Sequence, residues 1–398
     1  MEVLVVPWKE TRVMDVKFEF ALKAMDPHVS MKDLCAEYGI SRPTGHKWRN
    51  RFIQEGLAGL TERSRRPRIS PNQTSEDVLC DLVRIKVMHN KWGPKKIHEI
   101  YHRTHPFEAN PSLTTVKRVL DKAGLVHHRK KRRQTKGQRL QSRLTATKPN
   151  DIWTVDFKGW WYTPDGEKCE PLTVRDDFSK YILSIKAMQK AVTEEVKSEF
   201  ERLFSIYGLP RVIRSDNGPP FACVRGLLGL TRLSVWWLAL GIELDRITPG
   251  RPYENGGHER MHGDIKRELQ GQIQGGLKKH QAHFDVWRNE YNSVRPHEAL
   301  KMKTPETLYT KSKRPFPPEI PEVIYPTGYL VRSINNRGAV TIDRRRVFIS
   351  YALTGYSVGL RENKDESMTV WFDNLRLGEI DLRTYGFTPS VEGVKCFV

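Results

Sequence analysis

The sequence predicts a multidomain protein with two N-terminal all-α helix-turn-helix units, a central α/β core and a small C-terminal β-barrel. Three observations predict this fold class. Apolar residues recur at helical spacing up to residue 126, and they alternate at strand spacing from residue 150. Short apolar runs separated by turn residues then follow a proline-rich segment, as in small barrels. A chain of 398 residues is long enough for two or three domains of about 150 residues each.

The composition favours a partner that carries many negative charges. The formal net charge is +20 and the isoelectric point about 9.7, which indicates nucleic acid, although a basic ribosomal protein would also fit. The five cysteines form no CxxC pair, so neither a disulfide framework nor a cysteine zinc site is indicated. The richest apolar patch, residues 235–242, is far shorter than the ~20 residues of a membrane span. We therefore expect a cytoplasmic protein with no membrane partner.

Residues 1–60 are predicted to form the first helix-turn-helix unit. Apolar residues at 31, 34, 35 and 38 share one face of a helix that Gly39 ends. A second helix follows Ser41, a favourable N-cap, with Trp48 and Phe52 as its buried anchors. Any helical hairpin would share this pattern, but the high positive charge favours DNA binding. The second helix would present to a major groove the side chains of Arg42, Thr44, His46, Lys47, Arg49 and Asn50.

A second helix-turn-helix unit, dissimilar to the first, is predicted at residues 76–126, after a basic linker at 61–75. Gly93-Pro94 begins one of its helices and Ser112 caps the last. The outward side chains of that last helix, which we expect to contact DNA, are Thr114, Thr115, Lys117 and Arg118.

A further basic linker is predicted at residues 127–149. Its like charges repel one another, so it should stay extended unless it meets phosphates, and a merely solvated tether is the alternative. The side chains expected to bind DNA there are Arg129, Lys130, Lys131, Arg132 and Arg133.

The central core is predicted at residues 150–314. Its first three strands are close in sequence and should form an antiparallel meander. Strands and helices then alternate, which indicates a mixed sheet with helices packed on it. The expected order is strands at 152–157, 169–175 and 181–187, a helix at 193–207, a strand at 211–214, a helix at 227–240, a strand at 242–245 and a helix at 256–270.

The C-terminal domain is predicted at residues 327–385, after a proline-rich linker at 315–326. Three consecutive arginines, Arg344, Arg345 and Arg346, would suit a DNA contact, and a protein–protein role fits equally well. The short strands that suggest a barrel are expected at 329–332, 339–342, 347–350, 356–360, 368–372 and 377–380.

Three carboxylates of the core are the candidate catalytic residues. Asp156 lies inside an apolar strand, Asp216 ends another strand 60 residues later, and Glu259 opens a helix after a further 43 residues. If they meet in the fold, they could hold two divalent cations about 3.5–4 Å apart, which suits attack on phosphodiesters. Mg²⁺ prefers such carboxylate oxygens. Lys266, seven residues after Glu259 on the same helical face, could contact the phosphate near the metal.

At this point the chain resembles the DDE transposase and retroviral-integrase superfamily, specifically bacterial insertion-sequence transposases with an integrase catalytic core. The resemblance covers about residues 150–310. The segments that carry it are Trp153-Thr154-Val155-Asp156, Ser215-Asp216-Asn217-Gly218-Pro219-Pro220-Phe221, Pro249-Gly250-Arg251-Pro252, Asn255-Gly256 with Glu259 and Lys266, Tyr291-Asn292-Ser293-Val294-Arg295-Pro296-His297-Glu298-Ala299-Leu300 and Thr304-Pro305.

The resemblance implies an RNase H-like core in which Asp156, Asp216 and Glu259 bind two Mg²⁺ ions, with Mn²⁺ as a substitute. It implies binding of double-stranded DNA at the terminal inverted repeats of a transposon and in the target, with metal-dependent 3′-end cleavage and strand transfer. It also implies a dimer or tetramer on DNA in the bacterial nucleoid. Two departures are an insertion around residues 224–238 and a rival acidic residue, Glu254.

Two other functions fit parts of the sequence. A catalytically silent DNA-binding regulator would use the helical units alone, but the presence of all three carboxylates and Lys266 argues against it. A nuclease acting on RNA–DNA hybrids would have no need for two DNA-reading units.

Overall fold

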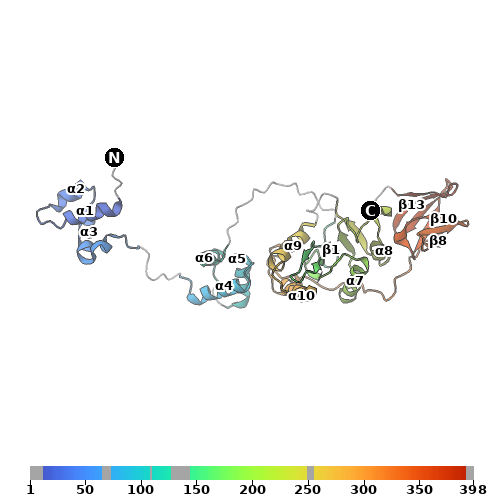
Figure 1. The fold of residues 1–398 in the computed structure, drawn as a ribbon, viewed down its shortest axis with the longest axis horizontal. Coiled ribbons are helices and arrows are strands. Elements are labelled where there is room, and N and C mark those ends of the chain that lie inside the picture. Colours follow the sequence, from blue (N-terminus) through green and yellow to red (C-terminus); the bar gives the residue numbers. More distant parts are fainter. Residues whose placement is uncertain (1–11, 65–72, 108–109, 127–143, 249–254, 391–398) are drawn as a thin grey trace. The chain divides into compact units, whose positions relative to one another are not determined.

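The computed structural model describes residues 12–64, 73–107, 110–126, 144–248 and 255–390, and its contacts divide the chain into two compact units, residues 1–74 and 75–398 (Figure 1). Within these described ranges, no helix is both long enough and apolar enough to cross a bilayer.

The first unit is a three-helix domain with its own core. Gly39, at φ +63°, provides the left-handed turn between the second and third helices. Ser41 stands at the predicted N-cap, but its hydroxyl contacts Thr44 Oγ1 at 2.9 Å and makes no capping bond to the backbone. Trp48 is buried as predicted and Phe52 packs partly buried against the same core. The helices are α1 (Val13–Lys23), α2 (Met31–Glu37) and α3 (Arg42–Glu55).

Three further helices form the start of the second unit, around a core that includes Ile97, Tyr101 and Leu120. Pro94 begins the middle helix, where its missing N–H costs nothing. Ser112 caps the last one, because its hydroxyl accepts a bond of 3.2 Å from Thr115 N. The helices are α4 (Glu76–Met88), α5 (Pro94–Thr104) and α6 (Leu113–Lys122).

A five-stranded mixed sheet of order β5-β4-β1-β6-β7 forms the centre of the core. Its first three strands are the predicted antiparallel meander, and β6 and β7 then add in parallel. The predicted strand at 169–175 is divided, because Pro171 has no N–H to donate to a ladder. The strands are β1 (Ile152–Phe157), β4 (Leu172–Asp176), β5 (Ile182–Lys186), β6 (Val212–Ser215) and β7 (Glu243–Arg246), and a small hairpin comprises β2 (Trp161–Tyr162) and β3 (Lys168–Cys169).

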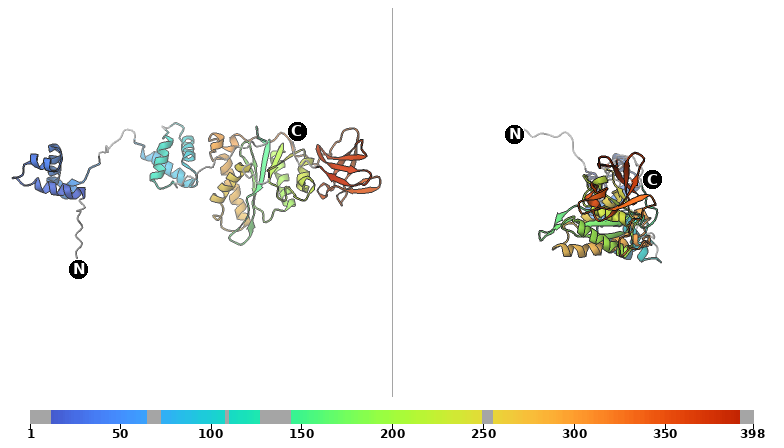
Figure 2. Two further views of the ribbon diagram at one scale, coloured as in Figure 1. Left: turned by 90° about the horizontal axis from the view of Figure 1, so that it is seen from above. Right: turned by 90° about the vertical axis from the view of Figure 1, so that its right-hand side faces the viewer.

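Helices cover both faces of this sheet (Figure 2). Trp153 and Val155 of β1 pack in one core with α7 and α8, whereas Ile182 and Ile185 of β5 pack in another with α9 and α10. The helix α10 was not among those predicted. These helices are α7 (Thr193–Tyr207), α8 (Arg232–Ala239), α9 (Gly256–Glu268) and α10 (Leu277–Ser293).

The predicted continuous helix at 227–240 is wrong. A 3₁₀ turn (Leu227–Gly229) precedes α8, and Leu228 has a left-handed φ of 50°. The Arg246 guanidinium donates to the carbonyls of Leu228 and Gly229 at 2.8 and 2.9 Å and so supports this non-helical turn. Thr231 then caps α8 by accepting a bond from Ser234 N at 3.2 Å.

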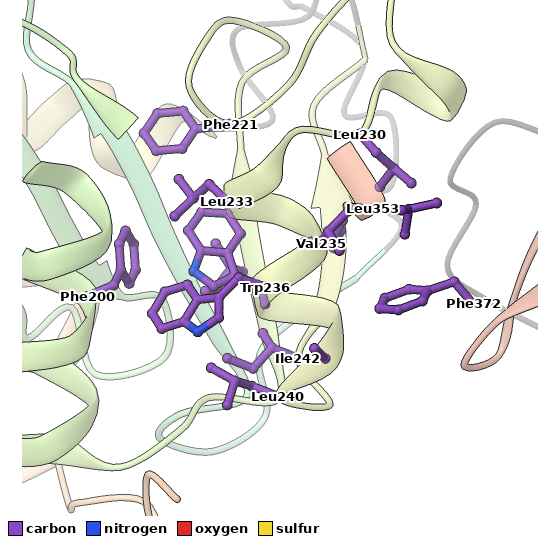
Figure 3. Packing of buried hydrophobic residues seen from close by; sticks show 14 of the residues in the cluster. Phe200, Phe221, Leu230, Leu233, Val235, Trp236, Leu240, Ile242, Leu353 and Phe372 are labelled. Carbon is purple, nitrogen blue, oxygen red and sulfur yellow. The ribbon is translucent and has the colours of Figure 1, made fainter. Parts of the chain in front are cut away.

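The same region joins the central core to the C-terminal strands. Leu230 and Val235 lie beside Leu353, while Leu233 and Trp236 face Phe200 and its neighbours in the central core (Figure 3). The insertion noted around residues 224–238 therefore contributes to one continuous apolar cluster.

The C-terminal strands do not close into the predicted barrel. Five of them form an open antiparallel sheet of order β14-β13-β12-β11-β8, and the other two form a separate hairpin. Pro389 lies in the edge strand β14, where its missing N–H prevents it from donating to a further strand. The sheet comprises β8 (Tyr329–Ser333), β11 (Ser357–Glu362), β12 (Ser367–Phe372), β13 (Leu375–Asp381) and β14 (Phe387–Pro389), and the hairpin comprises β9 (Ala339–Ile342) and β10 (Arg345–Phe348).

Candidate active site

Asp156 lies near the end of β1, directly opposite Thr173 of β4. Its side chain keeps 26% of its exposure. Burial, and after it the negative charges of Asp216 and Glu259, raise the pKa of Asp156 to about 7. Asp216 and Glu259 therefore each lie near enough to Asp156 to act on its carboxylate electrostatically.

Asp216 follows β6, the strand that pairs in parallel with β1. The carboxyl ends of parallel neighbours lie at the same sheet edge, which brings Asp216 towards Asp156. Gly218 donates a backbone bond to the Asp216 carboxylate, and a Cβ on Gly218 would lie 3.0 Å from Asp216 Oδ2. Asn217 donates to Ile247 O at 2.6 Å. These contacts explain the sequence Asp-Asn-Gly, since each residue supports the turn that holds the carboxylate.

Glu259 is exposed in the first turn of α9. Asn255 precedes this helix at the N-cap, but its side chain makes no capping bond and its buried Oδ1 has no partner. The rival residue Glu254 lies outside the described residues.

His258 anchors the start of α9 to the sheet beneath Asp156. Its Nδ1 lies 2.9 Å from Thr154 Oγ1 and its Nε2 2.6 Å from Thr173 Oγ1. The ring is fully buried, and burial, with smaller contributions from His262 and Arg175, lowers the pKa of His258 far below its usual range. The imidazole is therefore neutral and acts as a hydrogen-bonding link between helix and sheet.

His262, one turn later, lies beside the candidate carboxylate Asp156. Its Nε2 lies 2.7 Å from Thr173 Oγ1, and its Nδ1 lies 3.9 Å from Asp156 Oδ2. Thr173 donates its single hydroxyl hydrogen to the Asp156 carbonyl at 2.8 Å, so both histidine Nε2 atoms must donate to Thr173. This assignment leaves His262 Nδ1 unprotonated beside Asp156, in agreement with a His262 pKa lowered to about 3, chiefly by burial.

Two lysines lie near the carboxylates. Lys158, two residues after Asp156, lowers the Asp156 pKa, and its own pKa is lowered by burial and by the charge of Lys266. Lys158 and the exposed Lys266 therefore lie close to each other. Of these side chains, only Lys266 was predicted from the sequence; Lys158, His258 and His262 were not. A spacing of two along a strand and of four along a helix could have indicated them.

The donor set fits a divalent cation. Clustered carboxylates are the ligands that Mg²⁺ prefers, and the buried Oδ1 of Asp216 has no hydrogen-bond partner. Within the described ranges, however, no three acidic, histidine or cysteine side chains already enclose an ion. Mutual repulsion between carboxylates opposes such closure until a cation neutralises them.

The segment that follows α9 fixes this helix against the sheet. Arg295, 2% exposed, donates to Asp264 at 2.7 Å and to Glu268 at 3.0 Å, and both of these acceptors lie on α9. Asn292 pairs with the backbone N–H and carbonyl of Ile182 on β5, each at 2.9 Å. These two side chains of the motif noted at 291–300 thus connect the edge of the sheet to the helix that carries Glu259.

The predicted DNA-contacting side chains are mostly at the surface. On α3 four are exposed and two, Thr44 and Arg49, are half-buried, and on α6 only Thr115 is half-buried. DNA contact by these side chains stays a prediction. The predicted contacts of the second linker, Arg129, Lys130, Lys131, Arg132 and Arg133, lie outside the described residues.

Four domain families match the chain. Families described as Integrase core domain match residues 146–252 and 240–305. A family described as Helix-turn-helix domain matches residues 19–68, and one described as Homeodomain-like domain matches residues 44–120. The integrase-core matches span all three candidate carboxylates.

Among known proteins, the chain is similar to two proteins of insertion elements. It is 28% identical over 261 residues to an uncharacterised 31.7 kDa protein of insertion element IS407 from Burkholderia multivorans, which covers 65% of this chain and 89% of the relative. It is 27% identical over 245 residues to an uncharacterised 39.2 kDa protein of insertion element IS476 from Xanthomonas euvesicatoria, covering 61% and 67%.

Viral proteins also match. A Gag-Pol polyprotein of baboon endogenous virus is 32% identical over 127 residues, 32% of this chain and 7% of that protein. Among solved structures, the HTLV-2 integrase catalytic core in complex with magnesium is 20% identical, covers 42% of this chain and 100% of its own, and has a TM-score of 0.33.

Proposed function

Since the chain is an insertion-sequence transposase of the DDE and retroviral-integrase superfamily, we propose that it binds the terminal inverted repeats of its element and catalyses 3′-end cleavage and strand transfer into target DNA. The observation that supports this most is the electrostatic state of Asp156. A carboxylate whose pKa is raised to about 7 by burial and by two other carboxylates lies in a site where negative charge outweighs the nearby positive charge of Lys158.

We propose that Asp156, Asp216 and Glu259 hold two Mg²⁺ ions, for which Mn²⁺ substitutes. When bound, the metal supplies Lewis acidity and lowers the pKa of the attacking water or 3′-hydroxyl. The chain's own residues position the DNA. Lys158, close to Asp156, and Lys266, close to Lys158, would hold the phosphodiester next to the carboxylates.

His262 would hold α9 against β4 through Thr173 and would not transfer protons. Its pKa of about 3 keeps the ring neutral at physiological pH, and its Nε2 proton is already directed to Thr173. The buried link from His258 to Thr154 and Thr173 would keep α9, and with it Glu259, in register with the sheet.

The partners follow from this role. We propose that the two helical units read the element's ends in double-stranded DNA, that a dimer or tetramer joins two ends, and that the protein acts in the bacterial nucleoid. The three arginines Arg344, Arg345 and Arg346 are exposed on the β9–β10 hairpin and could add a DNA contact there.

The test is a cleavage assay on duplexes that carry the two ends of the element encoding this chain. Wild-type protein should release 3′-OH ends with Mg²⁺ or Mn²⁺ and not with EDTA, and Asp156→Asn should bind the same DNA without cutting it. Asp285→Asn removes a carboxylate on the surface of α10 and should cut normally. Wild-type binding without any nicking would favour the alternative, a catalytically silent DNA-binding regulator of the element.

A further inference from the structure

A cavity of about 960 Å³ lies between the helices α4 and α5 and the helices α9 and α10. Eight of the side chains that line it are lysine or arginine, and two, Asp264 and Glu298, are acidic. Such an excess of one sign in a recess of the surface concentrates the positive potential. The cavity is separate from the three candidate metal-binding carboxylates, none of which lines it.

The two acidic side chains do not neutralise this charge. Asp264 is engaged by Arg267 and Arg295, and Glu298 pairs with Lys95, which does not line the cavity. Among the described residues, Lys96 forms no ion pair. Burial, and after it the charge of Arg295, lowers the pKa of Lys96 to about 8. The charged form of Lys96 is therefore destabilised in this cavity.

Two of the lining arginines are almost wholly buried and still have an unused donor. Arg175 and Arg295 are each 2% exposed, and the Nε atom of each has no hydrogen-bond partner. Arg267 keeps an unpartnered Nε as well. A buried donor without an acceptor costs about 1–3 kcal/mol, more when it is charged. These arginines line the same cavity as Lys96, and a phosphate group bound there would neutralise part of their excess positive charge.

We propose that this cavity binds phosphate groups of the DNA backbone and thereby couples the helical unit at 76–126 to the helix that carries Glu259. The choice of DNA as the source of the phosphate rests on the proposed function. The cavity is lined from one side by α4 and α5 with the turn between them, and from the other by α9, which also carries Arg260 and Arg267. A backbone phosphate bound between them would neutralise the repulsion between Lys96 and Arg295.

The experiment measures how DNA affinity depends on salt. Full-length protein is titrated with a fluorescein-labelled duplex of arbitrary sequence over a series of KCl concentrations, in EDTA so that no cleavage occurs. Each phosphate contact contributes about 0.9 to the slope of log K against log salt. Lys96→Gln should lower the slope by about 0.9, and Lys96→Arg should restore it. Lys122→Gln is the matched control, since it removes an exposed lysine of the same helical unit that does not line the cavity.

Loss of the same slope in Lys122→Gln, or an unchanged slope in Lys96→Gln, would overturn the proposal. Calorimetric titration with inorganic phosphate separates the two sources of the ligand. If Lys96→Gln abolished phosphate binding but left DNA binding and its slope intact, free phosphate and not the DNA backbone would be the ligand. Because no step of this test requires cleavage, its result is independent of whether the carboxylates are catalytic.

Discussion

Replacing Asp156 with asparagine should stabilise the metal-free protein, and the gain should grow as the pH rises. Burial, Asp216 and Glu259 raise the pKa of Asp156 from 3.8 to about 7. The folded protein therefore keeps the Asp156 proton up to about pH 7, whereas the unfolded chain releases it near pH 4. Stability falls across this interval because the folded state binds more protons than the unfolded state. An amide at this position does not titrate, so the stability of the variant does not fall over this pH interval.

The magnitude follows from the pKa values. Between pH 5 and pH 8, stability changes only over the two pH units from 5 to the folded pKa of about 7, because above that pH both states have lost the Asp156 proton. At about 1.4 kcal/mol per unit, the difference between variant and wild type should grow by about 2.7 kcal/mol. The carboxylate keeps 26% of its exposure, and solvent screening lowers our expectation to about 2 kcal/mol.

The assay is urea unfolding in EDTA at pH 5 and pH 8, followed by the fluorescence of the buried core tryptophans, which include Trp153. Mg²⁺ should remove the variant's advantage at pH 8, since a cation that binds only the folded wild type stabilises it. A variant less stable than wild type at pH 8 without metal, or a difference that does not grow with pH, would refute the reasoning.

Asp177→Asn is the control, because this substitution should change folding stability in the opposite direction. Burial would raise the pKa of Asp177, but Lys180, Arg175 and Arg214 outweigh it and hold the pKa below its ordinary value. Its charge therefore stabilises the fold at both pH values, and the amide should lower stability at both.

Three further predictions concern other parts of the chain. Arg295→Met removes the buried partner of Asp264 and Glu268, which keep Arg267, and should therefore lower stability by less than the ~3–5 kcal/mol that an uncompensated buried charge costs, and an unchanged urea midpoint would contradict this. Lys158→Gln removes a charge that lowers the Asp156 pKa, so the acidic limb of the cleavage pH–rate profile should move to higher pH, and a limb that stays in place would count against the role of Lys158. Gly45→Ala places a methyl group 2.4 Å from Cys35 Sγ and should cost about 1–3 kcal/mol in the first helical unit. Adding Cys35→Ala should recover part of that loss in thermal unfolding, and no recovery would mean that the clash lies elsewhere.

The sequence by itself determined those features that depend on neighbouring residues. The helix at 193–207 and the strand at 339–342 have the same bounds in prediction and structure, because apolar periodicity is a local property of the chain. Asp156, Asp216 and Glu259 were singled out by local context as well: a strand, a strand end before Asn-Gly and the start of a helix.

Only the tertiary structure decided which distant groups meet. His258 reaches Thr154 and Thr173 because β1 and β4 are neighbours in the sheet, and residues 104 and 85 positions apart thereby share hydrogen bonds. The turn before α8 is held by Arg246, whose guanidinium binds the carbonyls of residues 17 and 18 positions earlier. The barrel prediction failed for the same reason, since strand spacing does not reveal whether the edge strands of a sheet will pair.

The electrostatic state of the site is likewise a tertiary property. Asp156 titrates at about pH 7 because strand order brings Asp216 beside it and α9 brings Glu259, while the surrounding protein removes water. Desolvation and Coulomb interactions act through space, and no window along the chain contains both the carboxylate and the groups that shift it.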